Sequence, residues 1–170
     1  MTRHDFLVKW GAYALALLPV WLVEACLLPD IPALEVRPML LPLAAAAVAV
    51  LEGAGGGAGF GLGAGLLWIC ASPGLEKWLA LGLCLAGLGA GLLTQYVLRR
   101  DLLGCILCSG VVLAALDGAR IVVRLFQGER GLEAMLRLSG REILCSLLFV
   151  IPIYGLFLWV FRRVPKRTHF

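Results

Sequence analysis

Residues 53–65 read GAGGGAGFGLGAG, a run made almost entirely of glycine and alanine. In water such a composition forms a flexible linker, but here apolar runs flank it, and Leu66-Leu67-Trp68 follows directly. A phosphate-binding loop would instead need Lys and Ser or Thr after the last glycine. The run therefore predicts a membrane helix with a small-residue face for close packing. The four-residue spacing involves Gly53, Gly57, Gly61 and Gly65, and it recurs at Gly87 and Gly91.

The composition of the whole chain supports a membrane location. Of its 170 residues, 61% are hydrophobic and 15% are charged, whereas soluble domains have about 45–50% and about 25%. A domain of this size cannot bury such an excess, because it must still cover its surface with polar groups. These values exclude a secreted disulfide scaffold, a nucleic-acid-binding module and a disordered tail. We predict one integral membrane domain over residues 1–170.

Apolar runs and turn signals divide this domain into about six predicted spans, each of which needs roughly 20 residues. They cover about 6–28, 37–51, 55–71, 78–98, 102–123 and 143–161, which predicts an all-α, polytopic membrane protein. We expect the first span to be retained, because Glu24 stands where a signal-peptide cleavage site requires a small residue. In the short second span, Pro38 suits the first turn and Pro42 should kink or break the helix.

Residues 125–141 form the only sizeable connection in this interpretation. Leu132, Met135 and Leu136 share one helical face within it. Ser139 and Glu142 have the spacing of a capping box, which predicts that the last helix starts after them.

Basic residues near the span ends predict the orientation. Six spans place both termini and the connection at 99–101 on one side, where we expect the cytoplasm. That side carries Arg3, Lys9, Arg99, Arg100, Arg162, Arg163, Lys166 and Arg167, whereas the other carries Arg37, Lys77, Arg124, Arg130, Arg137 and Arg141.

The chain offers no catalytic pattern. Cys105 and Cys108 form a CxxC motif, but no second CxxC exists and both histidines lie near the chain ends. Cysteine is also a small apolar residue suited to membrane helices, so we interpret the motif as packing. The spans contain no paired histidines, no HExxH and no Ser/His/acid set. We predict no enzymatic activity, no catalytic residue, no metal site and no cofactor.

Three ionisable residues fall inside predicted spans, where each is costly unless it is paired or hydrated. At 1.5 Å per residue, Glu24, Asp117 and Arg120 lie roughly 22–27 Å from the cytoplasmic ends, in the outer part of a core about 30 Å thick. Asp117 and Arg120 are three residues apart and can pair, whereas Glu24 joins them only if the first and fifth helices are neighbours. Three hypotheses remain: an ion pair that fixes helix packing, a polar ligand pocket, or an outward-facing cluster, with Arg124 at its rim, that positions 125–141 for a periplasmic partner.

The order of several motifs resembles the rod-shape-determining MreD family. The motifs are Arg37-Pro38-Met39-Leu40-Leu41, then Leu51-Glu52-Gly53, then Gly59-Phe60-Gly61-Leu62-Gly63 with Leu66-Leu67. A proline–glycine turn and basic residues after the fourth helix follow in the same order, so the resemblance extends from Arg37 to Arg163. The family often has an aspartate soon after the paired leucines, and here Trp68-Ile69-Cys70 stands there.

This resemblance implies a non-enzymatic, multi-pass component of the bacterial cell-elongation machinery in the inner membrane. It implies that the protein binds the bitopic protein MreC and supports peptidoglycan synthesis and cell shape, with no nucleic-acid partner. The MreD family is also similar in fold to the vitamin-binding S components of energy-coupling-factor transporters. An S component is therefore the alternative, and the Ala12-xxx-Ala16 pattern fits the docking face of such proteins. Few Asn, Gln, Ser or Thr residues are present to line a vitamin pocket, which favours the scaffold.

Overall fold

The computed structural model describes residues 3–27, 38–71, 78–96, 101–126 and 132–163, and all its regular elements are helices. The predicted span ends at 28, 37 and 98, and Arg37 of the family-like motif, lie outside these ranges. In chain order the elements are α1 (Arg3–Leu22), a π-helix η1 (Val23–Leu27), α2 (Leu40–Glu52), α3 (Ala54–Ala71), α4 (Trp78–Tyr96), α5 (Leu102–Phe126), α6 (Leu132–Leu148) and α7 (Val150–Arg163).

Several helices are suited to a bilayer. Three described segments are long and apolar enough to cross one, namely Asp5–Ala25, Trp78–Tyr96 and Leu102–Phe126. Met135–Leu148 and Val150–Arg163 qualify together as one span bent by 44°, whereas Leu40–Glu52 and Ala54–Cys70 are apolar but shorter. Large apolar side chains also face outwards, with Leu15 71% and Leu103 73% exposed, as lipid-facing residues are. The protein is therefore an all-α, membrane-embedded protein.

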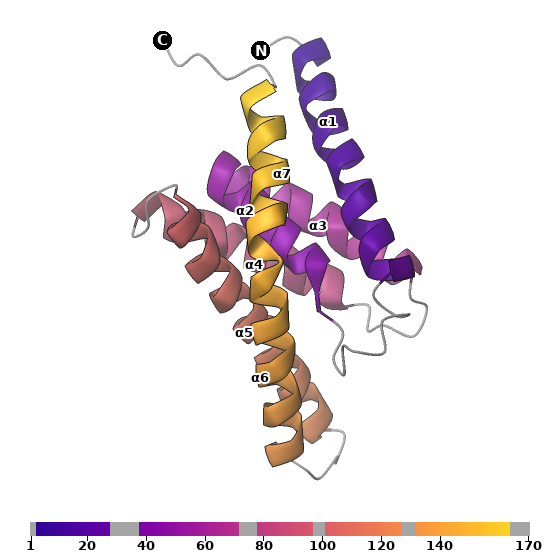
Figure 1. The fold of residues 1–170 in the computed structure, drawn as a ribbon, viewed down its shortest axis with the longest axis vertical. Coiled ribbons are helices and arrows are strands. Elements are labelled where there is room, and N and C mark those ends of the chain that lie inside the picture. Colours follow the sequence, from indigo (N-terminus) through magenta and orange to yellow (C-terminus); the bar gives the residue numbers. More distant parts are fainter. Residues whose placement is uncertain (1–2, 28–37, 72–77, 97–100, 127–131, 164–170) are drawn as a thin grey trace.

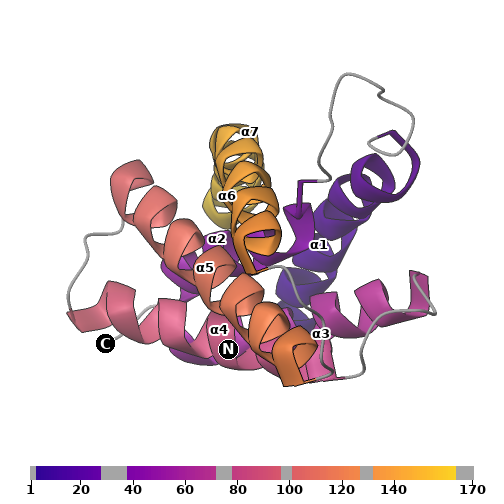
Figure 2. The same cartoon turned by 90° about the horizontal axis from the view of Figure 1, so that it is seen from below.

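The short helix α2 is the centre of the fold. Every residue from Leu40 to Leu51 is buried, because α1, α3, α4, α5 and α7 all contact this helix. A helix that is apolar on all sides requires such an enclosed position. Figure 1 shows α2 behind α7, and Figure 2 shows α3 and α4 side by side along one face of the molecule.

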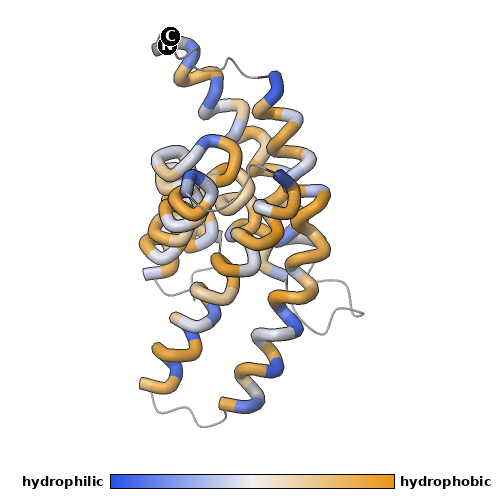
Figure 3. Tube along the Cα trace, turned by 90° about the vertical axis from the view of Figure 1, so that its left-hand side faces the viewer, coloured by the Kyte–Doolittle hydropathy of each residue, from blue (hydrophilic) through white to orange (hydrophobic). Residues whose placement is uncertain are grey.

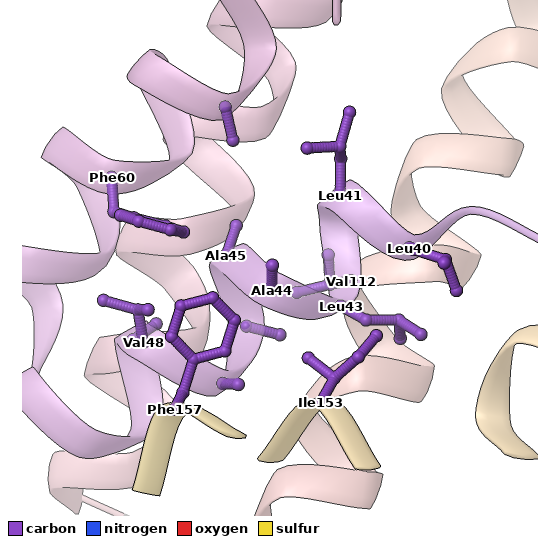
Figure 4. Packing of buried hydrophobic residues seen from close by; sticks show 14 of the residues in the cluster. Leu40, Leu41, Leu43, Ala44, Ala45, Val48, Phe60, Val112, Ile153 and Phe157 are labelled. Carbon is purple, nitrogen blue, oxygen red and sulfur yellow. The ribbon is translucent and has the colours of Figure 1, made fainter. Parts of the chain in front are cut away.

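Aromatic side chains complete the core around α2. The ring of Tyr13 from α1 stacks on Phe157 of α7, with centroids 6.2 Å apart. Phe60 of α3, part of the family-like motif, meets Phe157 edge-on at 5.6 Å. Figure 4 shows both phenylalanines converging on the small residues of α2, including Ala44 and Val48. The alanine-rich surface of α2 thus lets large rings from two other helices reach the centre of the fold.

Helices α3 and α4 pack through their glycines. A Cβ atom on Gly57 would lie 2.6 Å from the carbonyl oxygen of Gly87, and one on Gly61 would lie 2.5 Å from that of Leu83. A Cβ atom on Gly65 would lie 2.5 Å from the Cα of Ala80, and one on Gly91 would lie even closer to the Cα of Ala54. Only glycine permits such an approach between backbones.

Gly53 also turns the chain, and a second row of glycines in α3 faces outwards. Gly53 lies between α2 and α3 with a positive φ of 86°, and its N–H bonds to the carbonyl of Ala49. It ends α2 and turns the chain, and it also lies against α4, because its carbonyl carbon is 2.7 Å from a Cβ atom added on Gly91. Gly55, Gly59 and Gly63 are exposed and have no atom within 4 Å of an added Cβ.

The second predicted span needs correction. Helix α2 starts at Leu40 rather than 37, and Pro42 neither kinks nor breaks it. Proline is tolerated there because the N–H groups of the first turn have no intrahelical acceptor to lose. Pro38 is buried just before the helix rather than in its first turn.

The last predicted span also needs correction. Helix α6 begins at Leu132, so Ser139 and Glu142 lie inside it and do not cap a helix that starts at 143. The helical path breaks at Phe149, whose N–H bonds to the carbonyl of Ser146. Pro152 explains the break, because it has no N–H to donate to the carbonyl of Leu148, and because its ring crowds the same carbonyl.

Helices α5 and α6 extend beyond the rest of the molecule. Figure 1 shows their joined ends opposite the end at which α1 begins and α7 finishes. Figure 3 shows hydrophilic and apolar turns alternating along these two projecting segments.

Candidate functional site

A group of polar side chains gathers at the end of the fold opposite the termini. We call it the polar cluster, and it comprises Glu24 of η1, Asp117 and Arg120 of α5, and Ser139, Glu142 and Ser146 of α6. Buried polar groups are retained only where partners compensate their desolvation. The partners of each member therefore indicate what the cluster does.

Glu24 caps the central helix from outside. Its Oε2 accepts hydrogen bonds from the backbone N–H groups of Leu40 at 3.1 Å and Leu41 at 2.8 Å. The hydroxyl oxygen of Ser146 accepts a third hydrogen bond, of 3.0 Å, from the N–H of Met39. Met39 stands at the N-cap position of α2, and its own side chain makes no capping hydrogen bond. These acceptors satisfy donors that the first turn of any helix leaves unpaired, and the carboxylate also complements the positive end of the helix dipole.

Asp117 and Arg120 form the charged centre of the cluster. Arg120 Nη1 lies 3.7 Å from Asp117 Oδ1, and their side chains are 23% and 5% exposed respectively. The hydroxyl of Ser139 donates a 2.8 Å hydrogen bond to Asp117 Oδ2 and so joins α5 to α6. The guanidinium of Arg120 lies 5.3 Å from the centre of the Trp68 ring and 3.4 Å from the sulfur of Met39. This arginine therefore connects α5 with α3 and with the start of α2.

Electrostatic interactions join the remaining charges. Arg120 and Arg124 attract the Glu142 carboxylate, whereas Asp117 repels it, and Arg120 also attracts Glu24. The structure thus brings together the residues that sequence singled out, and α2, which contacts both α1 and α5, bridges them. Arg124 is exposed, at the edge of the group.

Sequence reasoning missed the α6 members of the cluster. Ser139, Glu142 and Ser146 recur at helical spacing on one face, a signal that could have placed them together. The interpretation of 125–141 as a connection concealed it, because a loop gives no reason to compare residues three and seven positions apart.

A second polar group, also missed, lies at the opposite end of α2. Lys9 pairs with Glu52 Oε2, and the Tyr13 hydroxyl donates a 2.8 Å hydrogen bond to Glu52 Oε1. The side chains of Lys9 and Glu52 are only 12% exposed. Lys9 therefore has a structural partner in addition to its role as a basic residue near a span end. Polar contacts fix both ends of the central helix.

The cysteines of the CxxC motif pack between helices. Cys105 and Cys108 are fully buried, and the thiol of Cys108 lies 3.7 Å from the carbonyl of Ala90 and 3.5 Å from the hydroxyl of Thr94. Within the described ranges, no three His, Cys, Asp or Glu side chains are placed to hold a metal ion.

Replacing Glu24 with alanine should destabilise the protein, because two buried N–H groups would lose their acceptor. Each unsatisfied buried donor costs about 1–3 kcal/mol. We expect a lower midpoint of thermal unfolding in detergent, with a smaller loss for Glu24→Gln, which retains an acceptor. Glu133→Ala, at an exposed acid of α6, is the control. A wild-type midpoint for Glu24→Ala would refute the capping role.

The fold and the cluster together define a polytopic helical membrane protein whose central helix is capped by charged and polar side chains. Comparisons with protein-family models, with curated proteins and with solved structures find no match for the chain.

Proposed function

We propose that this chain is a non-enzymatic membrane scaffold of the bacterial cell-elongation complex. In this proposal it lies in the inner membrane, binds MreC and supports peptidoglycan synthesis and cell shape, as its resemblance to the MreD family implies. The motifs behind that resemblance have structural roles here. Phe60 lies in the core, and the glycines that follow Phe60 and Glu52 form the α3–α4 contact and the α2–α3 turn.

The observation that carries the proposal is that the charged groups of the polar cluster find their partners within the protein. Asp117 is engaged by Arg120 and Ser139, and Glu24 by the first N–H groups of α2. An S component, the alternative, would direct such groups into a pocket to bind a polar vitamin. Here they hold helices together, which suits a rigid surface for protein partners.

The proposal includes six crossings with both termini in the cytoplasm. These crossings are α1 with η1, then α2, α3, α4, α5 and the bent pair α6–α7. At 1.5 Å per residue, the 13 residues of α2 extend only about 20 Å, less than a core of about 30 Å. Such a helix can still serve as a crossing, because protein rather than lipid surrounds it and because Glu24 and Ser146 accept hydrogen bonds from the N–H groups at its start. The beginning of α1 and the end of α7 lie at one end of the fold (Figure 1), as an even number of crossings requires.

Co-purification tests the scaffold. The tagged chain, extracted in mild detergent from cells that also produce MreC, should retain MreC, whereas an unrelated single-span protein produced at the same level should be lost. Loss of MreC together with retention of the transmembrane subunit of an energy-coupling-factor transporter would overturn the proposal in favour of the S component.

A further inference from the structure

One face of α6 changes from charged to apolar along its length. Arg137, Arg141, Leu144 and Leu148 follow at spacings of four, three and four residues, so they lie on one helical stripe. All four are exposed, Leu144 to 69% and Leu148 to 74%. Ile151, 58% exposed, continues the apolar surface past the break into α7. The arginines therefore stand at the end of a surface that faces lipid chains.

The length of this path places the two arginines at an interface. At the far end of α7, the Arg163 guanidinium lies 4.1 Å from the centre of the half-exposed Trp159 ring, and Trp with Arg is typical of a membrane–water boundary. From Arg141 to Arg163 the helical path measures roughly 33 Å at 1.5 Å per residue. A hydrocarbon core is about 30 Å thick. Arg141 thus lies at the opposite boundary, and the first turns of α6 lie in the headgroup layer.

Apolar side chains are also exposed on the first turns of α6 and at the end of α5. Leu132, Leu136 and Leu138 are about half exposed, and Phe126 at the end of α5 is 88% exposed. We call the far ends of α5 and α6 the projection. So many exposed apolar side chains on the projection would be unfavourable in bulk water. The headgroup layer accommodates them, because it suits helices that combine leucine or phenylalanine with basic residues.

The charge of the projection determines which lipid it suits. Arg124, Arg137 and Arg141 are exposed there, and among the described residues of the projection Glu133 is the exposed acid. Basic side chains near a bilayer surface favour anionic headgroups, and arginine matches phosphate oxygens with two parallel N–H donors.

We propose that the projecting ends of α5 and α6 lie in the headgroup layer on the side opposite the termini, and that Arg137 and Arg141 bind the phosphates of anionic phospholipids. This inference concerns the bilayer and does not depend on the scaffold function.

Hydrogen exchange in nanodiscs tests the inference. The full chain is placed in nanodiscs of phosphatidylcholine alone or mixed with phosphatidylglycerol, and the exchange of amides in 132–141 is followed by mass spectrometry. We expect slower exchange with phosphatidylglycerol, by about fivefold for each arginine engaged. The double variant Arg137→Gln/Arg141→Gln should lose this difference, whereas Arg162→Gln/Arg163→Gln, at the other boundary, should keep it.

Unchanged exchange in α4 shows that each variant remains folded. Equal exchange of 132–141 in the two lipids, or a lipid difference that survives in Arg137→Gln/Arg141→Gln, would overturn the inference. Protection that appears only with a co-purified protein, in either lipid, would also overturn it and would assign the surface to that protein.

Discussion

Replacing Gly57 with alanine should sharply lower the accumulation of folded protein. The new methyl group would lie 2.6 Å from the carbonyl oxygen of Gly87 and even closer to Ala49, so backbone rather than a flexible side chain would have to move. Ordinary overpacking costs about 1–3 kcal/mol, and we expect at least about 3 kcal/mol here. That is a large part of the stability of a typical domain, about 5–15 kcal/mol.

The neighbouring glycines provide a matched control for this substitution. Gly59 belongs to the same helix, and a Cβ atom added there has no atom within 4 Å. Gly59→Ala should therefore accumulate at the wild-type level, as measured by size-exclusion chromatography after detergent extraction. Equal amounts of Gly57→Ala and Gly59→Ala would show that the α3–α4 contact is not as close as described.

Replacing Arg120 with alanine should be the most damaging single change in the polar cluster. It leaves the carboxylate of Asp117, only 5% exposed, without its positive partner. Removal of one member of a buried ion pair costs about 3–5 kcal/mol. Asp117→Ala should cost somewhat less, because Arg120 is 23% exposed and keeps its contact with Trp68. Protein abundance in the membrane fraction measures both effects.

Sequence alone predicted the class of fold well. Long apolar runs and a small-residue stretch are sufficient to indicate an all-helical membrane protein, because a bilayer admits few other structures. The breaks within helices were harder to predict. Pro42 is harmless where the first turn has no bond to lose, whereas Pro152 interrupts the path between α6 and α7. The effect of a proline depends on where the helix starts, and sequence leaves that start uncertain.

The candidate site was predicted only in part. Glu24, Asp117 and Arg120 stand out because charges are rare in apolar runs. What Glu24 binds could not be foreseen, since its partners are the N–H groups of a helix sixteen and seventeen residues later in the chain. The pairing of Lys9 with Glu52 joins residues 43 positions apart, and it depends on α1 and α2 being neighbours.

We infer that the polar cluster is one coupled structural unit. A double-mutant cycle tests it with Asp117→Ala, Arg120→Ala and the variant that carries both, using the free energy of unfolding in mild detergent for all four proteins. We expect the double variant to be more stable than Arg120→Ala, because no uncompensated carboxylate remains. Coupling within the cluster would be contradicted if the two single losses added to within about 0.5 kcal/mol, as they do for independent sites.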